Sequence, residues 1–579
     1  MSFAHDGGSG PTASALAGAP DRLNLATDVL VIGGGLAGTW AAVAAREAGA
    51  RVVLVDKGFC GTSGVTAPAG PGHWWLPPDP ALRADAVARR HDAGLGLADA
   101  DAMHRALDDT WRRLPTLAPW YDFPRDAGGQ PHYKALRGPE YLRAMRARVL
   151  AAGATVIDHA PALELLRDAD GAIAGARGLL RQPRPGLPAG SDWQVRAGAV
   201  VIATGGCAFR ARLLGADTNT GDGYLMAAEA GAELSGMEFS SYHTVTPTWS
   251  SMTRAMSYAF ARYFDADGHE LDIPFSHDGM VALARALDAG PVTCSLDRMP
   301  ESVREALPRI SPNVLLSFDR AGVDPFRQRF EITLRGEGTV RGVGGLRHIS
   351  ADAETTVPGL YAAGDASSRE PIAGAISGGG AQNSSWALST GVRAGAAAAR
   401  RALDPGREAG DRPSAGGTAG SAAAPVRAAT PGHGPQADAP LTALGEAGLR
   451  TRTDARSGLS AAEAIELVRR EILPFNQSLY RDGARLAGAL ARLDALWQEL
   501  REHAGADRNR HDPAASLDRL RWREAAALVA SARWCQGAAL ARRESRGLLV
   551  RDDLPAADTA LAARLHTGGL DRRWTRLAA

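Results

Sequence analysis

Three glycines and one acidic residue near the start of the chain have the spacing of a dinucleotide-binding site. Gly33, Gly35 and Gly38 fit the pattern G-x-G-x-x-G, and Asp56 lies 23 positions after the first glycine. In such a site the glycines permit a tight turn, close approach of a pyrophosphate to the backbone, and close packing of helix on strand. The helix N-terminus then offers free N–H groups to phosphate, and a carboxylate at the position of Asp56 accepts hydrogen bonds from ribose hydroxyls.

Two later loops favour FAD over NAD as the dinucleotide. The segments 199–206 (AVVIATGG) and 356–370 (TVPGLYAAGDASSRE) each place small residues directly after a buried strand, where backbone amides can reach an extended cofactor. Asp365 is a second carboxylate, suited to the ribityl chain of FAD. No second G-x-G-x-x-G follows a clear strand and no C-x-x-C occurs, which argues against a separate NAD(P)H domain and a redox disulfide.

The elements that must position these residues can be read from the hydrophobic pattern. Residues 27–57 predict a strand, a glycine turn, a helix and a second strand, with the continuous apolar runs of buried parallel strands. Residues 155–204 predict two strands joined by a D-A-D-G turn, then another buried strand. From 357 a further strand leads into a helix that begins at Asn383-Ser384-Ser385, where Asn383 or Ser384 would cap its N-terminus.

Composition excludes several classes of protein. The 579 residues are 45% hydrophobic and 22% charged, which is typical of a globular chain with more than one domain. The net charge of +1 gives no reason to expect nucleic acid or an anionic membrane as a partner. The four cysteines are far apart, so we expect no disulfide framework and no metal or iron–sulfur cluster held by this chain alone. No apolar run is long enough to span a membrane, and we expect a cytoplasmic protein.

The predicted fold is α/β, with a Rossmann-like FAD-binding domain, an inserted α+β capping domain and a helical C-terminal domain. Residues 404–440 are rich in Pro, Gly, Ala and Ser and predict a flexible linker. The N-terminal segment has neither the basic nor the apolar region of a signal peptide and predicts a disordered leader. The expected boundaries are 1–26 for the leader, 27–235 and 345–403 for the FAD-binding domain, 236–344 for the capping domain, and 441–579 for the C-terminal domain.

Two segments resemble the flavoprotein family of fumarate reductase and succinate dehydrogenase. TNTGDGYLMAAEAGAELSGMEF (218–239) is similar to that family's run from T-G-D-G into a strand with M-E-x-x-x-x-H, and ARRESRGLLVRDDLP (541–555) is similar to its specific C-terminal signature. The resemblance covers about 27–400 and 458–560. It implies FAD as cofactor and, within the family, a general likeness to the members near the adenylylsulfate reductase α subunit. The cofactor contacts expected besides the glycines and Asp56 are Lys57, Ser63, Thr204, Gly205, Asp222, Asp365, Asn383 and Ser384.

Departures from the family pattern bear on the substrate. Ser63 falls where membrane-bound members carry the histidine that links FAD covalently, so we expect noncovalent FAD. The comparable proton-donor region, 251–272, lacks R-G-E-G-G, Ser377 stands nearest the place of a second substrate arginine, and Val340 replaces a substrate histidine. Succinate or fumarate is therefore not the expected substrate, and L-aspartate meets the same objection.

His243 and Arg341 are the expected catalytic residues. His243 matches the family's substrate-side histidine and could hydrogen-bond a substrate oxygen or move a proton, because an ordinary histidine pKa lies near working pH. The alternative is a buried histidine satisfied by Ser240, Ser241 or a carbonyl. Arg341 lies in a glycine-rich segment that meets substrate in the family and would bind an anionic group, unless it is a surface arginine in a loop. Further candidates are His73-Trp74-Trp75, Arg254, Tyr258, Arg262, Arg347 and His348.

These observations predict an FAD-dependent oxidoreductase that transfers a hydride between a substrate carbon and flavin N5. One alternative is a flavin electron-transfer subunit that works with a ferredoxin-like iron–sulfur partner, which loss of the substrate arginines would also produce. A second alternative is an enzyme like fumarate reductase or L-aspartate oxidase.

Overall fold

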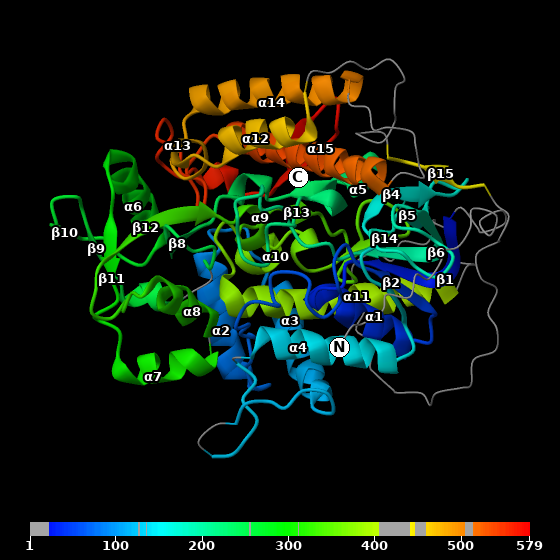
Figure 1. Cartoon of the computed structure of the whole chain (residues 1–579), viewed down its shortest axis with the longest axis horizontal. Helices are drawn as coiled ribbons and strands as arrows, with labels where there is room; N and C mark the ends of the chain where they lie inside the picture. The colour runs from blue at the N-terminus through cyan, green and yellow to red at the C-terminus, as the bar shows by residue number, and fades with distance from the viewer. Residues whose placement is uncertain are drawn as a thin grey trace, which may run out of the picture.

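The computed structural model describes residues 22–125, 128–134, 136–253, 256–310, 312–403, 440–445, 459–503 and 513–578. The predicted linker, 404–440, lies outside these residues except for its last position. The described part of the chain forms a main sheet, a capping sheet and a group of C-terminal helices (Figure 1).

The main sheet is mixed, with its parallel strands at the centre. Its order is β15-β4-β5-β6-β1-β2-β3, and β14 pairs with β6. The strands β1, β2, β3, β6 and β14 run parallel, whereas β4, β5 and β15 pair antiparallel at one side. The strands are β1 Arg22–Ile32, β2 Val52–Val55, β3 Thr155–Ile157, β4 Ala162–Arg167, β5 Ile173–Leu179, β6 Asp192–Ile202, β14 Leu360–Ala362 and β15 Thr442–Ala443.

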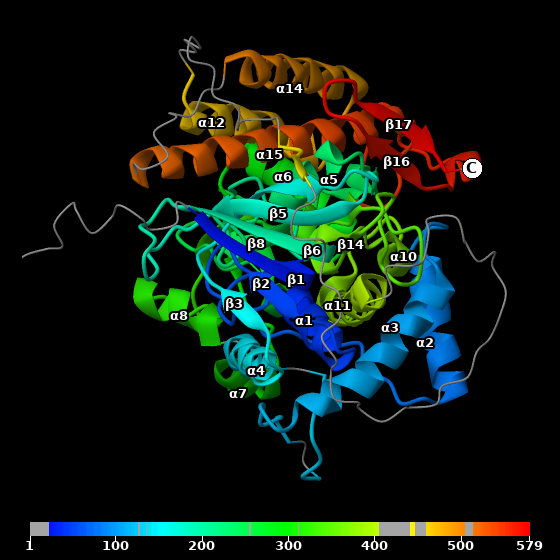
Figure 2. The same ribbon diagram turned by 90° about the vertical axis from the view of Figure 1, so that its right-hand side faces the viewer.

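Both faces of this sheet are covered, which explains its continuous apolar strands. Val29 and Val31 pack in the core on the side of α1 (Leu36–Glu47) and α11 (Gly379–Leu403), whereas Leu30 and Ile32 pack on the opposite side with α15 (Pro513–Ala541). Alternate residues of a strand point to opposite faces, so every position of such a strand must be apolar. Figure 2 shows the resulting layers, with α15 above the sheet and α1 and α11 below it.

Small residues bring the two helices of the lower layer into close contact. A Cβ on Gly391 would lie 2.4 Å from the carbonyl oxygen of Ala37, and one on Gly395 would lie 2.1 Å from that of Ala41. Helix α11 begins at Gly379, four residues before Asn383. The predicted cap at Asn383 or Ser384 is therefore wrong, because the run of glycines at 378–380 belongs partly to the helix.

The predicted end of the leader is also wrong. Strand β1 begins at Arg22, and residues 22–27 pair in register with 192–197 of β6. Leu23 and Leu25 pack against the core while their neighbours are more exposed. This alternation is the pattern of a half-buried strand, and it was present in the sequence RLNLAT.

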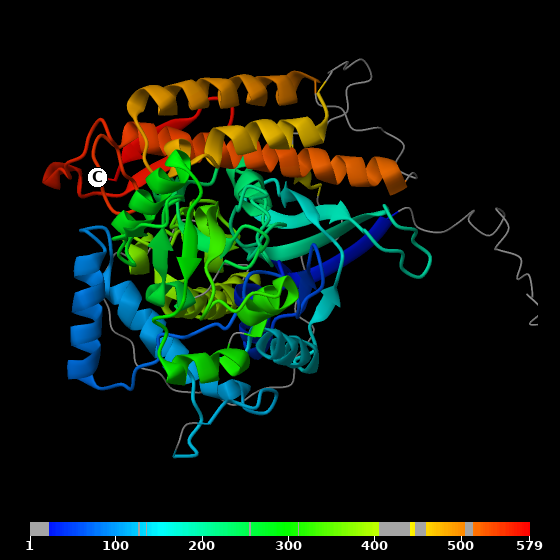
Figure 3. The ribbon, with the colours of Figure 1, turned by 60° about the vertical axis from the view of Figure 1, so that its left-hand side comes forward.

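The capping sheet lies to one side of the main sheet (Figures 1 and 3). Its order is β10-β9-β11-β12-β8, all antiparallel. Three helices pack with it around a separate apolar core that includes Leu283, Phe318 and Ile332. Its elements are β8 His243–Pro247, η4 Met256–Phe260, β9 Arg262–Phe264, β10 Glu270–Leu271, α6 His277–Ala289, β11 Thr293–Ser295, α7 Glu301–Ile310, α8 Pro312–Ala321 and β12 Phe330–Gly336.

The C-terminal helices pack on the main sheet rather than standing apart. Helix α15 contacts α5, α12 and α14, and Figure 3 shows α12, α14 and α15 stacked on one side of the molecule. This part also carries strands, because β16 pairs with β7 and β17 in a small sheet with β13. The elements are α12 Ala461–Ile472, α13 Phe475–Ser478, α14 Gly483–His503, η6 Thr559–Leu561, β16 Leu565–Gly568 and β17 Trp574–Leu577.

The remaining elements connect these layers. Helices α2, α3 and α4 follow β2 in the chain, and most of the other connecting elements are short. They are α2 Pro80–Ala93, α3 Ala100–Arg113, η2 Leu114–Leu117, α4 Gly138–Ala151, α5 Asp222–Glu229, β7 Leu234–Ser235, η3 Met237–Phe239, α9 Gly338–Arg341, β13 Gly345–Leu346, η5 Gly364–Ala366 and α10 Glu370–Ala373.

Candidate active site

A cavity of about 830 Å³ is lined both by the main sheet and by the capping sheet. Its nucleotide end is lined by residues 32, 33, 35–37, 55–59, 62–66, 159–162 and 203–205. Its cap end is lined by residues 242–245, 258, 275–277 and 280, together with Arg341. A cavity of this size is within the range that binds cofactors and small ligands in proteins.

The three motif glycines differ in what surrounds them. Gly33 has φ +108°, and a Cβ there would lie 2.3 Å from the carbonyl oxygen of Ala203. A Cβ on Gly38 would lie 1.8 Å from the carbonyl oxygen of Gly33, so α1 and β1 touch at this point. Around Gly35, by contrast, the nearest neighbour would be the carbonyl oxygen of Ser63 at 4.0 Å. Gly35 lines the cavity and leaves its backbone open to a phosphate.

The carboxylate of Asp56 organises the loop that follows β2. It accepts hydrogen bonds from the backbone N–H of Gly34, from the N–H of Gly58 at 2.7 Å and from the hydroxyl of Ser63 at 2.6 Å. A carboxylate has about four acceptor sites, so one site is left for a ribose hydroxyl. The structure thus assigns Ser63 a bond to Asp56, which the sequence did not indicate.

Lys57 lines the cavity, but its ammonium group is already paired. Its Nζ lies 2.9 Å from Oδ2 of Asp222 and 2.5 Å from Oε1 of Glu524, and it donates to the hydroxyl of Thr220 at 3.0 Å. Burial acts to lower the pKa of Lys57, but these two carboxylates outweigh it and raise the pKa. Lys57 therefore ties the nucleotide end to α15, and no local signal in the sequence predicts its partner Glu524.

Asp365 lies at the cavity wall beside a buried arginine. Arg369, which is fully buried, forms an ion pair with Asp365 and donates to the carbonyl oxygen of Thr339 at 2.5 Å and to that of Gly342. Arg369 thus joins the loop after β14 to the segment that carries Arg341. Arg369 is not among the residues expected from the sequence, and no helical spacing indicates its pairing, because Asp365 and Arg369 do not belong to one helix.

Besides the buried Nδ1 of His243, Nε2 of His277 and Nε of Arg341, two buried side-chain atoms of cavity-lining residues have no partner within the described protein. They are the hydroxyl of Thr204 and Oδ1 of Asn383. Both residues line the cavity, as do Gly205 and Ser384. Because buried polar atoms are nearly always hydrogen-bonded, these two fit a site that a polar cofactor completes.

His243 is buried at the cap end and is held by the C-terminal helices. Its Nε2 lies 3.3 Å from the hydroxyl oxygen of Ser478 in α13, and its ring makes an edge contact with Phe475. Gly336 pairs with His243 in the ladder of β8 and β12, and a Cβ at 336 would lie 3.1 Å from Nε2. Burial lowers the pKa of His243 to about 3, so the expected pKa near working pH is wrong and the ring is neutral at pH 7.

Arg341, at the end of α9, also lines the cap end and contacts Tyr242, the residue before His243. Its Nη2 donates to the phenol oxygen of Tyr242 at 3.3 Å, and its guanidinium lies 4.8 Å from the centre of the Tyr242 ring. The buried carboxylate of Glu337 interacts electrostatically with Arg341 and accepts a hydrogen bond from Thr244 at 2.7 Å. Arg341 is therefore not a surface arginine.

The cap end contains residues that the sequence analysis did not select. His277, at the start of α6, lines the cavity, and burial lowers its pKa to about 4. Tyr242, Phe275 and Met280 line it too, and Tyr258, a weaker candidate, joins them. Ser377 also lines the cavity. These residues come from segments without a motif, so only the fold could bring them together.

Several sequence candidates lie outside this cavity. Trp75 stacks between Trp111 and Tyr133, and His73 packs on Tyr141, so this segment is part of the core. Arg347 is paired with Glu233 at 2.6 Å, and Nε2 of His348 lies 2.8 Å from the carbonyl oxygen of Ala362. Arg262 pairs with Asp297 and Glu270. Arg254 lies outside the described residues.

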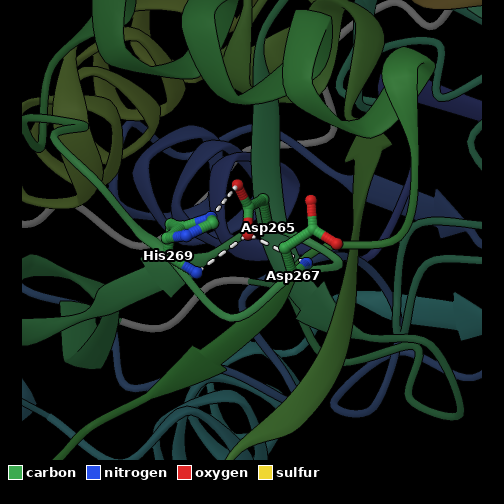
Figure 4. A group of neighbouring side chains, drawn as sticks. All are labelled: Asp265, Asp267 and His269. Atoms are coloured by element: carbon green, nitrogen blue, oxygen red, sulfur yellow. Dashed lines mark hydrogen bonds and ion pairs between the residues drawn. The ribbon is translucent and has the colours of Figure 1, made fainter.

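An exposed group of possible metal ligands occurs in the capping sheet. Asp265, Asp267 and His269 lie together in the turn between β9 and β10 (Figure 4). Asp265 already accepts hydrogen bonds from the backbone N–H groups of Asp267 and His269. The group is a hydrogen-bonded turn on the surface and is remote from the cavity lining.

Cys60, Cys207, Cys294 and Cys535 are all free and buried, and burial raises the pKa of each thiol. No described helix is both long and apolar enough to cross a bilayer.

Comparison with known families finds one match for the part of the chain around the cavity and another for the C-terminal helices. The family described as "FAD binding domain" matches residues 28–120 and 85–382, and "Fumarate reductase flavoprotein C-term" matches 470–574. The first match alone spans more than half of the chain. The residues around the cavity and the C-terminal helices therefore belong to one family of flavoproteins.

Individual members of known flavoprotein families are similar to this chain in sequence or in fold. L-aspartate oxidase of Streptomyces coelicolor is 30% identical over 387 residues, which are 59% of this chain and 63% of that enzyme, so the chain spans less than two thirds of it. The fold resembles that of E. coli quinol fumarate reductase FrdA, with TM-score 0.74, 20% identity, and coverage of 96% of each chain. It also resembles adenylylsulfate reductase of Archaeoglobus fulgidus, with TM-score 0.70, 17% identity and 97% of each chain.

Proposed function

We propose that this chain, which belongs to the fumarate reductase/succinate dehydrogenase flavoprotein family and is an FAD-dependent oxidoreductase, acts on a substrate other than a four-carbon dicarboxylate. The observation that carries the proposal is the charge at the cap end. Among the described residues that line the cavity, the cations are Lys57, Arg181 and Arg341, and only Arg341 lies at the cap end. A dicarboxylate held there would leave one buried charge uncompensated, which is costly.

FAD is the cofactor, and when bound it supplies the hydride chemistry. We propose that it binds noncovalently. The backbone at Gly33 and Gly35 would hold its pyrophosphate, and Asp56 its ribose. The unpartnered hydroxyl of Thr204 and amide oxygen of Asn383 would bind its polar edges. The remaining proposed contacts are Gly38, Lys57, Ser63, Gly205, Asp222, Asp365 and Ser384, of which Lys57 and Asp222 act mainly by holding the loop in place.

His243 and Arg341 would orient the substrate. Because His243 is neutral at pH 7, its role is a hydrogen bond to a substrate oxygen rather than the charge of an imidazolium. Arg341 donates a hydrogen bond to Tyr242 and interacts electrostatically with Glu337, and it would pair with an anionic group on the substrate. The capping sheet would exclude water from the reacting carbon.

The proposal is tested with the purified flavoprotein under anaerobic conditions. Its flavin is reduced chemically, and reoxidation is followed by absorbance with oxygen, fumarate, other enoates, ketones and a ferredoxin. The oxidised form is mixed with succinate and L-aspartate. We expect an uncharged or singly charged acceptor to reoxidise the flavin, and succinate, fumarate and L-aspartate to be inert.

Two other candidate functions give different results. The similarity to L-aspartate oxidase favours an enzyme of that kind, for which L-aspartate would bleach the flavin within the mixing experiment. An electron-transfer subunit with a ferredoxin-like iron–sulfur partner would be reoxidised by the ferredoxin alone. Rapid turnover with fumarate would contradict the proposal and restore the dicarboxylate function.

A further inference from the structure

The cap end of the cavity combines one positive charge with an apolar wall. Arg341 is the only cation there among the described residues. Two imidazoles, His243 and His277, add hydrogen-bonding groups, but burial keeps both neutral at pH 7. The wall beside them is apolar and is formed by Val245, Tyr258, Phe275 and Met280.

The charges around Arg341 admit one negative group and oppose a second. Glu337, which is buried and does not line the cavity, interacts with the guanidinium and offsets part of its charge. Asp365, a carboxylate of the cavity wall that also interacts with Arg341, is already paired with Arg369. A singly charged ligand would therefore find one guanidinium in the cavity wall, whereas a second anionic group would find no further cation in the described wall at the cap end. Arg481, which acts on His243 and His277, is buried outside that wall. Burying an unpaired ion costs several kcal/mol.

Phe275 supplies a second observation that points to an apolar ligand. It belongs to the cavity lining and yet is 50% exposed, the highest value among the described phenylalanine and tryptophan side chains. It precedes α6, whose residues Ser276, His277 and Met280 also line the cavity. Exposed aromatic surface at a cavity rim is typical of a place that a ligand covers.

We propose that the substrate is a monocarboxylate with an apolar body, in which Arg341 pairs with the carboxylate and the apolar part lies against Phe275 and Met280. This inference rests on the proposed function, because it takes the bound compound to be the substrate. The contacts with Arg341, Phe275 and Met280 concern binding alone. The inference narrows the substrate class from any singly charged compound to an acid whose remaining surface is mainly hydrocarbon.

The test measures binding to the oxidised FAD-containing protein by perturbation of the flavin spectrum, without turnover. The probes are 3-phenylpropionate, its uncharged amide 3-phenylpropanamide, acetate and succinate. We expect 3-phenylpropionate to bind at least about tenfold more tightly than its amide, the gain of one charge-assisted hydrogen-bonded pair. We expect a similar or larger preference over acetate and succinate, because apolar burial or charge balance is lost in each.

Variants show which residues cause the preference for 3-phenylpropionate over the other probes. Arg341→Gln should abolish the preference for acid over amide, and Arg341→Lys should keep part of it. Phe275→Ala should weaken 3-phenylpropionate but not acetate. Arg347→Gln is the matched control, because Arg347 pairs with Glu233 away from the cavity and should leave all four affinities unchanged. The ratio of acid to amide does not depend on how much of a variant is correctly folded.

Several outcomes would overturn the inference. They are tighter binding of succinate than of 3-phenylpropionate, equal binding of acid and amide, no binding of any probe, or an unchanged ratio in Arg341→Gln. Failure of the proposed function is recognised separately. If the acid binds as expected but the reduced flavin is reoxidised only by ferredoxin, the binding site stands and the oxidoreductase proposal fails.

Discussion

Nε2 of His243 lies 3.3 Å from the hydroxyl oxygen of Ser478, although 235 residues separate them in the sequence. His243 belongs to the capping sheet, and Ser478 ends a short helix of the C-terminal part. The Ser478 hydroxyl also bonds to the carbonyl oxygen of Pro474 at 2.8 Å, which fixes its position. The orientation of the candidate active-site imidazole is thus set by a part of the chain that forms little of the cavity wall.

Removing this support should slow the reaction without removing FAD. For Ser478→Ala we expect kcat to fall about tenfold, because a misplaced group at the reacting centre is costly, while FAD content stays unchanged. Ser478→Thr keeps the hydroxyl and should recover most of the rate. Equal rates for Ser478→Ala and the unchanged protein would show that packing against Phe475 alone holds the ring.

Replacing the imidazole itself tests whether it meets substrate. His243→Gln should leave FAD bound and lower kcat about 100-fold, the usual effect of losing one oriented hydrogen bond to a reacting oxygen. Because burial lowers the pKa of His243 to about 3, the rate of the unchanged protein should show no inflection from this residue above about pH 5. An inflection near pH 6.5 that disappears in His243→Gln would contradict the neutral ring.

Replacement of the second and third glycines of the motif, Gly35 and Gly38, should impair different properties of the protein. In Gly35→Ala the new methyl group points into open space at the cavity, so the protein should fold but bind FAD at least about tenfold more weakly. In Gly38→Ala the methyl group meets the backbone of Gly33, so the melting temperature should fall even without FAD. Melting curves of both variants, with and without added FAD, distinguish the cases, and equal losses of stability would contradict the assignment.

Glu524 should couple the C-terminal helices to the nucleotide end. In Glu524→Gln, both Lys57 and Arg210 lose a charged partner. We expect the free energy of unfolding to fall by about 2 kcal/mol, between the values for exposed and buried pairs, and FAD to dissociate faster. Glu466→Gln is the control, since Glu466 pairs only with Arg469 at the surface of α12. An unchanged rate of FAD dissociation in Glu524→Gln would show that α15 does not influence the binding of the cofactor.

Buried histidines should make the fold sensitive to acid. His73 is 2% exposed, and burial lowers its pKa from 6.5 to about 3. The unfolded chain binds this proton below pH 6.5 and the folded chain does not, so the free energy of unfolding falls as the pH drops from 6.5 towards 3. For His73→Phe this slope should decrease by about 1.4 kcal/mol per pH unit between about pH 4 and 6. Denaturant titrations across that range measure it, and an unchanged slope would contradict the buried neutral ring.

The sequence alone determined the nucleotide end of the cavity. Gly33, Gly35, Gly38 and Asp56 lie within one β-turn-α-β unit, where short-range spacing fixes the geometry of the loop. The buried strands β1, β2, β6 and β14 could also be predicted, because a strand covered on both faces must be apolar at every position. What the sequence misplaced were the ends of elements, such as the start of β1 and the start of α11, where glycine and half-buried positions give weak signals.

Only the tertiary structure decided the cap end and the partners of charged groups. Glu524 beside Lys57 and Ser478 beside His243 are brought together by packing of separate layers. The burial that makes His243 neutral also arises from those layers, so no motif could reveal its charge state. Local spacing specifies local geometry, whereas the electrostatics of a buried site depend on every element packed around it.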